Sequence, residues 1–272
     1  MKRIGLSVLT SLALLTGTVP ACASTAGEDV VRSVVNAIER EDCPAAVGAL
    51  KDGLAKNLPE VVFMAGGMYE DGICLKANWQ RAVDFYVLAN EQGNRAARYR
   101  LVSGYAAPVG GKDVAAALWW ASRRPGEVIG ACQVGAADHD DPDRFVAVLA
   151  KWPKARLDAC NYVAGVMATL TGDIEYPGRA QSHALNGTVV VRFTPAAAKF
   201  EIVSAETEEL TMSGWVDGNA VRDRQSKSVT GSFAKAINQI GARALKRYAQ
   251  PAGIDPAWTS EVKFVFTLLY RN

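Results

Sequence analysis

Apolar side chains recur at three- and four-residue spacing through the first half of the chain. Such spacing gathers them on one face of a helix. The pattern starts after Glu28 and starts again after Pro44, a residue that suits the first turn of a helix. We therefore expect a helical hairpin here. Its apolar positions are Val30, Val31, Val34, Val35 and Ile38 in the first helix, and Ala45, Val47, Leu50 and Leu54 in the second.

A near-repeat follows, in which Pro59–Gly93 is echoed more loosely by Arg95–Gly126, at an offset of 36 residues. A fixed offset of that size is typical of stacked helical hairpins. A hairpin too small to bury its own apolar face must stack on a neighbour, and the stack leaves an extended groove suited to holding other proteins. The corresponding residues are Val61 and Ala97, Ala65 and Leu101, Gly66 and Val102, and Tyr69 and Tyr105.

Two more helices complete this helical array. Asp141 is a natural N-cap and Pro142 a natural first residue for a helix that contains Phe145–Leu149. Another helix is expected over Ala155–Leu170, where apolar residues again have helical spacing. Residues 28–170 are therefore predicted to be all-helical.

Toward the C-terminus the apolar pattern changes to strict alternation, which predicts strands. Thr194-Pro195 and the alanines after it predict a turn between the first two strands. A helix separates the second strand from the third, and Thr230 or Ser232 is expected to cap it. The alternating segments are 189–193, 200–203 and 262–268, and the apolar face of the helix comprises Phe233, Ile237, Ile240, Ala244 and Tyr248.

These patterns predict a mixed fold: an N-terminal all-α array of helical hairpins, followed by a small α+β domain whose helix lies across an antiparallel sheet. Composition changes between Thr171 and Ala180, where an alanine-rich pattern gives way to glycine, proline and polar residues. We place the domain boundary there. Residues 24–172 then form the helical-repeat domain and residues 173–272 the α+β domain.

The first residues have the order of a secretory signal, with Lys2 and Arg3, a short apolar run, and then Ala21-Cys22-Ala23. We expect cleavage after Ala23 and export of the rest of the chain. An alternative is lipid modification of Cys22. Association with a membrane is expected only if Cys22 is lipidated or the signal stays uncleaved.

The net charge of the chain bears on whether its partner is a nucleic acid. Removing residues 1–23 takes away two basic residues and no acidic one, so the formal net charge falls from +2 to 0. Binding to nucleic acid rests on clustered positive charge. A neutral mature chain therefore argues against a nucleic-acid partner.

Four cysteines remain after the expected cleavage, and an even number in an exported chain favours disulfides. Three pairings are possible. We favour Cys43 with Cys74 and Cys132 with Cys160, because each bond would tie neighbouring hairpins and close a loop of similar length. The close C-x-x-C spacing typical of metal sites and redox centres is absent.

The repeat resembles the Sel-one-like repeat, a relative of the tetratricopeptide repeat. Small residues let the helices approach, aromatic residues fill the interior of the hairpin, and Gly72 permits a tight loop. The resemblance implies a protein-binding array. It rests on Gly67, Tyr69, Asp71-Gly72, Lys76, Ala82, Phe85-Tyr86, Ala89 and Gly93, with an echo in Ala97, Leu101, Tyr105, Gly110, Asp113, Ala117 and Trp119-Trp120.

The C-terminal part resembles the carboxy-terminal domain of TonB-type energy transducers. The resemblance is carried by Tyr176-Pro177, Ala180, the run Asn186–Phe193, and the closing strand Val262–Leu268. In that family Tyr-Pro leads into the domain and Gly-Thr-Val begins the first strand. The resemblance implies a small α+β fold, a Gram-negative source and a periplasmic location.

Catalytic chemistry finds little support. After cleavage only His139 and His183 remain as histidines, and neither sits in a catalytic motif. The acidic run Asp138–Asp143 around His139 suggests a metal loop, but it lacks the glycine and glutamate of a calcium loop, and capping of the next helix explains it better. We expect no enzymatic activity, no metal and no cofactor.

Candidate partner-binding residues are Trp119, Trp120, Arg123 and Arg124. Aromatic and arginine residues are enriched at protein hot spots, and two adjacent tryptophans cannot both point into one helical interface. Charge reversal of the two arginines would then weaken binding without lowering the melting temperature. The alternative packs both tryptophans between hairpins and leaves the arginines in solvent.

Three functional hypotheses follow. The leading one is an exported, periplasmic, non-enzymatic adaptor that binds another envelope or secreted protein, with its groove and with a sheet edge that pairs an extended segment. The second is an immunity-type inhibitor that occludes a secreted effector. The third is an envelope transport component related to TonB, which requires an uncleaved signal as its anchor.

Overall fold

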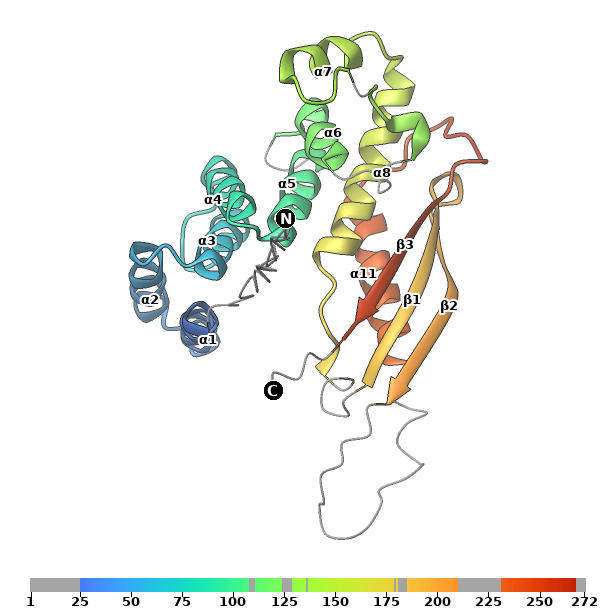
Figure 1. The fold of residues 1–272 in the computed structure, drawn as a ribbon. Helices are drawn as coiled ribbons and strands as arrows, with labels where there is room; N and C mark the ends of the chain where they lie inside the picture. Colours follow the sequence, from blue (N-terminus) through green and yellow to red (C-terminus); the bar gives the residue numbers. More distant parts are fainter. Residues whose placement is uncertain are drawn as a thin grey trace, which may run out of the picture.

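The computed structural model describes residues 25–107, 111–123, 129–135, 137–178, 180, 185–209 and 231–267. The predicted signal segment lies outside these residues. Helical hairpins come first, followed by two further helices and then a sheet with one helix (Figure 1). The helices are α1 (Thr25–Glu39), α2 (Cys43–Ala55), α3 (Pro59–Asp71), α4 (Trp79–Glu91), α5 (Arg95–Ala106), α6 (Val114–Ser122), α7 (Pro142–Leu149), α8 (Lys154–Gly172) and α11 (Ser232–Arg247).

The offset of 36 residues corresponds to a repeated structure. Asn78 caps α4 and Asp113 caps α6, each by accepting a backbone hydrogen bond three residues on. The backbone N–H of Asn78 donates to the carbonyl of Tyr69, and that of Asp113 to the carbonyl of Tyr105. The same capping scheme therefore closes both hairpins. The predicted helical-repeat architecture is confirmed at the level of the fold.

Helix starts follow the sequence signals, with one exception. Pro44 lies in the first turn of α2, and Asp141 caps α7 with Pro142 in its first turn. The prediction that Thr230 or Ser232 caps α11 is wrong for Ser232, which lies inside the helix, while Thr230 lies outside the described residues. Gly231 occupies the N-cap position, and no side chain bonds the first amides of α11.

The sheet consists of β1 (Leu185–Thr194), β2 (Lys199–Glu209) and β3 (Ser260–Phe266), in the antiparallel order β2-β1-β3. All three predicted strands are present, although Leu268 lies outside the described residues. The predicted turn between the first two strands is a short 3-10 helix, Pro195–Ala197, which Ala198 closes in the left-handed conformation. The fold class is therefore as predicted, a helical array followed by a small antiparallel α+β unit.

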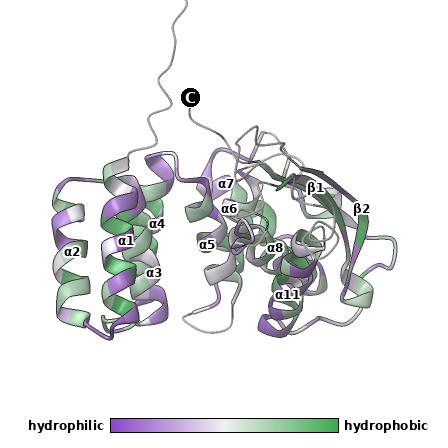
Figure 2. Ribbon diagram, turned by 90° about the horizontal axis from the view of Figure 1, so that it is seen from below, coloured by the Kyte–Doolittle hydropathy of each residue, from purple (hydrophilic) through white to green (hydrophobic). Residues whose placement is uncertain are grey.

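Helix α11 packs across one face of the sheet, behind it in Figure 1. In Figure 2 the helices carry both hydrophobic and hydrophilic residues, as expected of helices that bury one face. The buried side of α11 faces the inward residues of β1 and β3. The core between them contains Phe233, Ile237, Ile240, Val189, Val191, Phe264 and Phe266.

Helix α8 joins the two predicted domains through a common core. Every residue from Ala159 to Leu170 is buried, because α8 packs on α5 and α6 and also on α11. One hydrophobic cluster therefore contains residues from α5, α6 and α8 together with Phe193 and Tyr248 of the α+β half. The change from helices to strands after Gly172 is not a break in packing.

Close backbone approach and polar contacts secure this junction. A Cβ on Gly165 of α8 would lie 2.6 Å from Cε1 of Tyr248 and 2.8 Å from Cβ of Ala106, so only glycine fits. The Tyr248 hydroxyl lies 2.9 Å from both the Thr169 hydroxyl and the carbonyl oxygen of Ser103. Helices α5, α8 and α11 are thus joined by a buried hydrogen-bonded hydroxyl.

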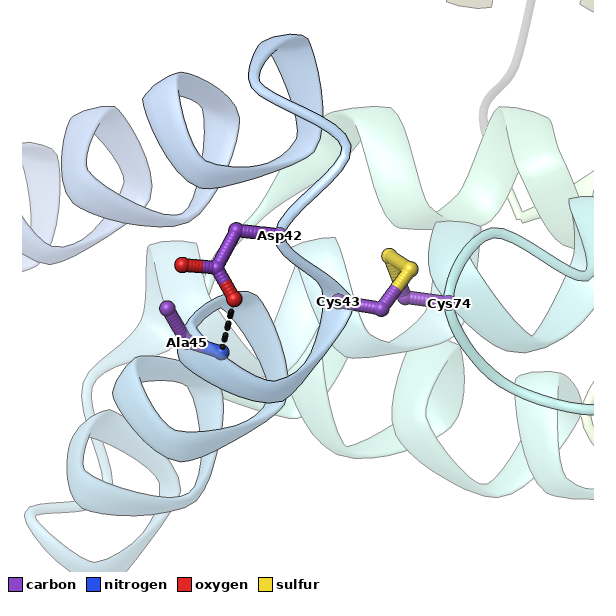
Figure 3. The surroundings of a disulfide bond; sticks show 4 residues. All are labelled: Asp42, Cys43, Ala45 and Cys74. Carbon is purple, nitrogen blue, oxygen red and sulfur yellow. Dashed lines mark hydrogen bonds between the residues drawn. A yellow bond between two sulfur atoms is a disulfide. The ribbon is translucent and has the colours of Figure 1, made fainter.

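Both favoured disulfides are present. Cys43 at the start of α2 bonds Cys74 in the loop between α3 and α4, beside the Asp42 cap of α2 (Figure 3). Cys132 bonds Cys160 of α8. The bonds span 31 and 28 residues, so on the chain-entropy model each stabilises the fold by about 3 to 4 kcal/mol. Among the described helices, none combines the length and the apolar character needed to cross a membrane.

Candidate functional site: a cleft between the hairpins and the C-terminal half

The two halves leave a cleft where α1, α3 and α4 face the end of α8 and the middle of α11. Figure 1 shows these helices on opposite sides of the molecule, joined through α5. The cleft is open to solvent, with a volume of about 470 Å³. Pockets that bind small molecules commonly have volumes of about 300 to 1,000 Å³. The cleft is therefore large enough to hold a side chain with its neighbours.

One wall of the cleft is apolar. Ile38 of α1 and Phe63, Met64 and Met68 of α3 line it, and Ile73 lies at its rim in the loop after α3. Ile73 is 39% exposed, one of the few large apolar side chains of the described residues that solvent reaches to this extent. Methionines adapt their shape to what they contact. This wall is suited to an apolar side chain of a ligand.

The charged wall of the cleft centres on Arg100 of α5. Its Nε lies 3.3 Å from Oε2 of Glu70, its Nη2 lies 3.6 Å from Oδ2 of Asp71, and its Nη1 lies 3.1 Å from Oδ1 of Asp173. Glu70 and Asp71 end α3, and Asp173 caps the end of α8. One guanidinium therefore joins the repeat array to the last turn of the shared helix.

Two further contacts complete this network. The hydroxyl of Tyr86, a fully buried residue of α4, donates to Oε2 of Glu70 at 2.7 Å. Arg247 of α11 reaches Oε1 of the same carboxylate at 3.4 Å. The Glu70 side chain is only 10% exposed. A carboxylate in that position needs all of these partners, because an unpaired buried charge is strongly unfavourable.

Burial and neighbouring charges change the acidities in the cleft. Burial raises the pKa of Tyr86 far above its ordinary range, and the Glu70 carboxylate adds to the effect. Burial alone would lower the pKa of Arg100. Tyr86 and Glu70 raise that pKa by more than burial lowers it, so Arg100 stays charged. Burial and Glu70 also raise the pKa of Asp71 against the opposing effect of Arg100.

The structure separates the sequence-predicted binding residues from this cleft. Trp119 packs edge-on against Phe145 with ring centroids 5.2 Å apart, and Trp120 packs against two hydrophobic clusters of the helical half. Arg124 lies outside the described residues. Neither tryptophan lines the cleft.

The Arg123 side chain makes its contacts within the molecule. Its guanidinium lies 3.7 Å from the ring centroid of Trp119, and its Nη1 donates to Oδ1 of Asp140 at 3.2 Å. It also donates to the backbone carbonyls of His139 and Trp119. Arg123 therefore holds the acidic loop on the end of α6, and it is not left in solvent.

The acidic loop has a structural explanation. Asp141 accepts backbone hydrogen bonds from the first turn of α7. His139 contacts Asp140 and the carbonyl of Ser122. Within the part of the chain that the structure describes, no three His, Cys, Asp or Glu residues are grouped so as to hold a metal. His183 lies outside the described residues.

Sequence reasoning missed the residues that form the charged wall. The sequence does contain one indication of Arg100. This residue stands 36 residues after Met64, at the corresponding position of the second repeat. The same repeat position is apolar in the first copy and charged in the second, and both side chains line the cleft. A charge that replaces an apolar residue at a repeated position indicates a local change of environment. The partners Asp173 and Arg247 carry no such signal, because they come from outside the repeat.

The chain matches no model of a known protein family, no curated protein and no solved structure.

Proposed function

We propose that the chain is an exported, non-enzymatic adaptor that binds another envelope or secreted protein in the cleft between its helical hairpins and its α+β half. The observation that carries this proposal is the cleft itself, with one apolar wall and one charged wall. Stacked helical hairpins provide extended concave surfaces of this kind. The resemblances to Sel-one-like repeats and to the TonB carboxy-terminal domain favour the same class of function.

Two features support a polypeptide as the ligand. The cleft is open to solvent, so a segment of a partner protein can enter it. Its walls come from both halves of the molecule, and the shared helix α8 together with Arg100 fixes their separation. A preorganised cleft binds with a smaller loss of conformational entropy.

A periplasmic location is part of the proposal. Two disulfides are typical of proteins in an oxidising compartment outside the cytoplasm. Export by the segment 1–23 provides the route to such a compartment. An amino-terminal residue of Ser24 on the mature protein would support this part of the proposal, and a retained Met1 would contradict it.

The test is affinity capture from an envelope extract of the source cell with three baits. The first is the unaltered mature chain. The second is Gly67→Trp, which fills the cleft, because a Cβ at Gly67 meets only the Tyr86 hydroxyl at an ordinary 3.7 Å. The third is the control Gly48→Trp on an exposed face of α2, where a Cβ meets nothing within 4 Å.

A partner protein retained by the unaltered chain and by Gly48→Trp, and lost from Gly67→Trp, is the expected result. Equal melting temperatures of the three baits would exclude unfolding as the cause of the loss. Retention by all three baits would move the binding surface elsewhere. Absence of any retained protein would contradict the adaptor function.

A further inference from the structure

The residues that line the cleft carry more negative than positive charges. Its lining contains three carboxylates, Asp71, Asp173 and Glu175, against the two guanidinium groups of Arg100 and Arg243. Glu70 lies behind this lining and is matched by Arg247. The lining therefore has a formal charge of −1, and this excess charge faces the open space of the cleft.

The two arginines of the lining differ in how far carboxylates surround them. Arg100 is surrounded by three carboxylates and is 20% exposed, so little of its charge is available to an incoming anion. Arg243 lies 4.0 Å from Asp173, at the limit of an ion pair, and its side chain is 65% exposed. The two arginines together offset two of the three carboxylates, and one negative charge of the lining remains for a cationic ligand.

Two of the three carboxylates are accessible to a ligand. The Asp71 side chain is 52% exposed and has only the 3.6 Å contact with Arg100. Glu175 is exposed and has neither a hydrogen bond nor an ion pair with any described residue. Both carboxylates can accept hydrogen bonds from a cationic group without breaking the network around Glu70.

Apolar side chains line the cleft together with these carboxylates. Phe63 presents an aromatic ring there, with its centroid 5.7 Å from that of Tyr86. The long stems of lysine and arginine pack on apolar surface while their charged heads stay in a polar environment, and aromatic faces attract cations. A basic side chain satisfies both walls of the cleft at once.

We infer that the cleft recognises a polypeptide segment in which a lysine or arginine adjoins a large apolar residue. The basic group reaches Asp71 and Glu175, and the apolar neighbour packs on Ile73 and the methionines of α3. This inference rests on the proposed function and gives its ligand a chemical class. It also distinguishes the cleft from a general hydrophobic groove, which would have no preference for charge.

The test is selection of a random peptide library displayed on phage against three immobilised proteins. These are the unaltered mature chain, Glu175→Lys, and Glu91→Lys, which makes the same charge change on an exposed residue of α4 outside the cleft lining. The library is first passed over immobilised Gly67→Trp, which removes the peptides that bind outside the cleft. Selected peptides are then synthesised, and their affinities for each protein are measured by fluorescence anisotropy.

Enrichment of lysine or arginine beside leucine, isoleucine, methionine or phenylalanine is the expected result. Affinity should fall about tenfold in Glu175→Lys, where an attraction becomes a repulsion, and should be unchanged in Glu91→Lys. Enrichment of acidic residues, equal affinity for both charge variants, or no enrichment would each overturn the inference. So would dimerisation of the unaltered chain that Gly67→Trp abolishes, because the occupant would then be a second copy.

Capture and peptide selection together separate the charge preference of the cleft from the adaptor function. A partner captured through the cleft by the unaltered chain, combined with peptides that lack basic residues, overturns only the charge preference. Failure of both capture and selection overturns the function as well.

Discussion

At the scale of single residues, the charged wall depends on a hydroxyl group that the sequence could not assign. The repeat predicts Tyr86 as an aromatic residue inside its hairpin, and the side chain is fully buried. The repeat does not predict that its hydroxyl bonds Glu70, because that contact depends on how α3 and α4 pack. Sequence periodicity gives the environment of a residue more readily than its polar partner.

Replacing Tyr86→Phe should lower the free energy of unfolding by about 2 kcal/mol, the value of a hydrogen bond to a buried charged group. The change removes the hydroxyl and leaves Glu70 with fewer partners. Tyr69→Phe is the matched control, because that hydroxyl accepts an exposed hydrogen bond from Arg81 at 3.0 Å. Its effect should stay within about 0.5 kcal/mol. Urea unfolding of both variants measures the difference, and equal stabilities would contradict the role given to Tyr86.

Arg123 changes an expectation drawn from the sequence. The adjacent tryptophan and arginine pairs predicted an exposed binding patch whose alteration would leave the melting temperature unchanged. The structure gives Arg123 a ring contact and several internal hydrogen bonds, so this variant is expected to be less stable. Sequence cannot separate a hot spot from a structural cation–π pair, since both use the same residue types.

Arg123→Ala should lower the free energy of unfolding by about 1 to 2 kcal/mol, because it removes the contact with Trp119 and the bonds to the acidic loop. Arg144→Ala serves as the control, since that side chain is 67% exposed and has one surface contact, with Asp141. Its effect should be within about 0.5 kcal/mol. Thermal unfolding followed by circular dichroism decides, and an unchanged melting temperature for Arg123→Ala would restore the exposed-patch interpretation.

At the scale of elements, local signals were sufficient for most of the helices and strands. The offset of 36 residues, the proline at the start of α2 and the Asp141-Pro142 pair all act within a few residues of the element that they define. The start of α11 was missed in detail, because Gly231 caps it without a side-chain bond and therefore leaves no polar signal. The strands followed from alternation, whereas their order in the sheet depends on long-range pairing.

Close contact between hairpins predicts a large effect at one glycine. A Cβ on Gly104 of α5 would overlap the ring of Trp79 in α4, so Gly104→Ala should lower the free energy of unfolding by about 1 to 3 kcal/mol. Gly48→Ala in α2 meets nothing within 4 Å, and its better helix propensity should raise stability by about 1 kcal/mol. Opposite shifts in urea midpoints are expected. A gain of stability in both variants would show that the hairpins do not pack as described.

At the scale of the whole molecule, the predicted domain boundary conceals a common core. The composition changes after Thr171, but α8 packs on α5 and α11 alike, and Phe193 of β1 reaches Tyr162 of α8 with centroids 6.0 Å apart. The cleft exists only because these parts are held together. Neither its position nor the residues from α8 and α11 follow from local sequence, because they depend on contacts across more than one hundred residues of chain, such as that between Glu70 and Arg247, 177 residues apart.

A common core predicts a single unfolding transition. Phe193→Ala should lower the free energy of unfolding by about 3 to 5 kcal/mol. Tryptophan fluorescence should show this full loss of unfolding free energy. Among the described tryptophans only Trp258 lies in the α+β half, so the signal comes mainly from the helical half. Val265→Ala, on a strand residue that is 63% exposed, should have little effect. Two separate transitions, with only the second shifted by Phe193→Ala, would mean that the halves unfold independently.

We propose that a partner protein binds in the cleft between the two halves. The most direct measurement places a photo-crosslinking amino acid at Ile73 on the rim of the cleft, and in a second protein at Val146 of α7, which is similarly exposed and lies outside the cleft. Both proteins are produced in the source cell, irradiated and recovered. A discrete adduct with one partner protein at position 73 and none at position 146 is the predicted result. An adduct only at position 146, or at neither position, would contradict binding in the cleft.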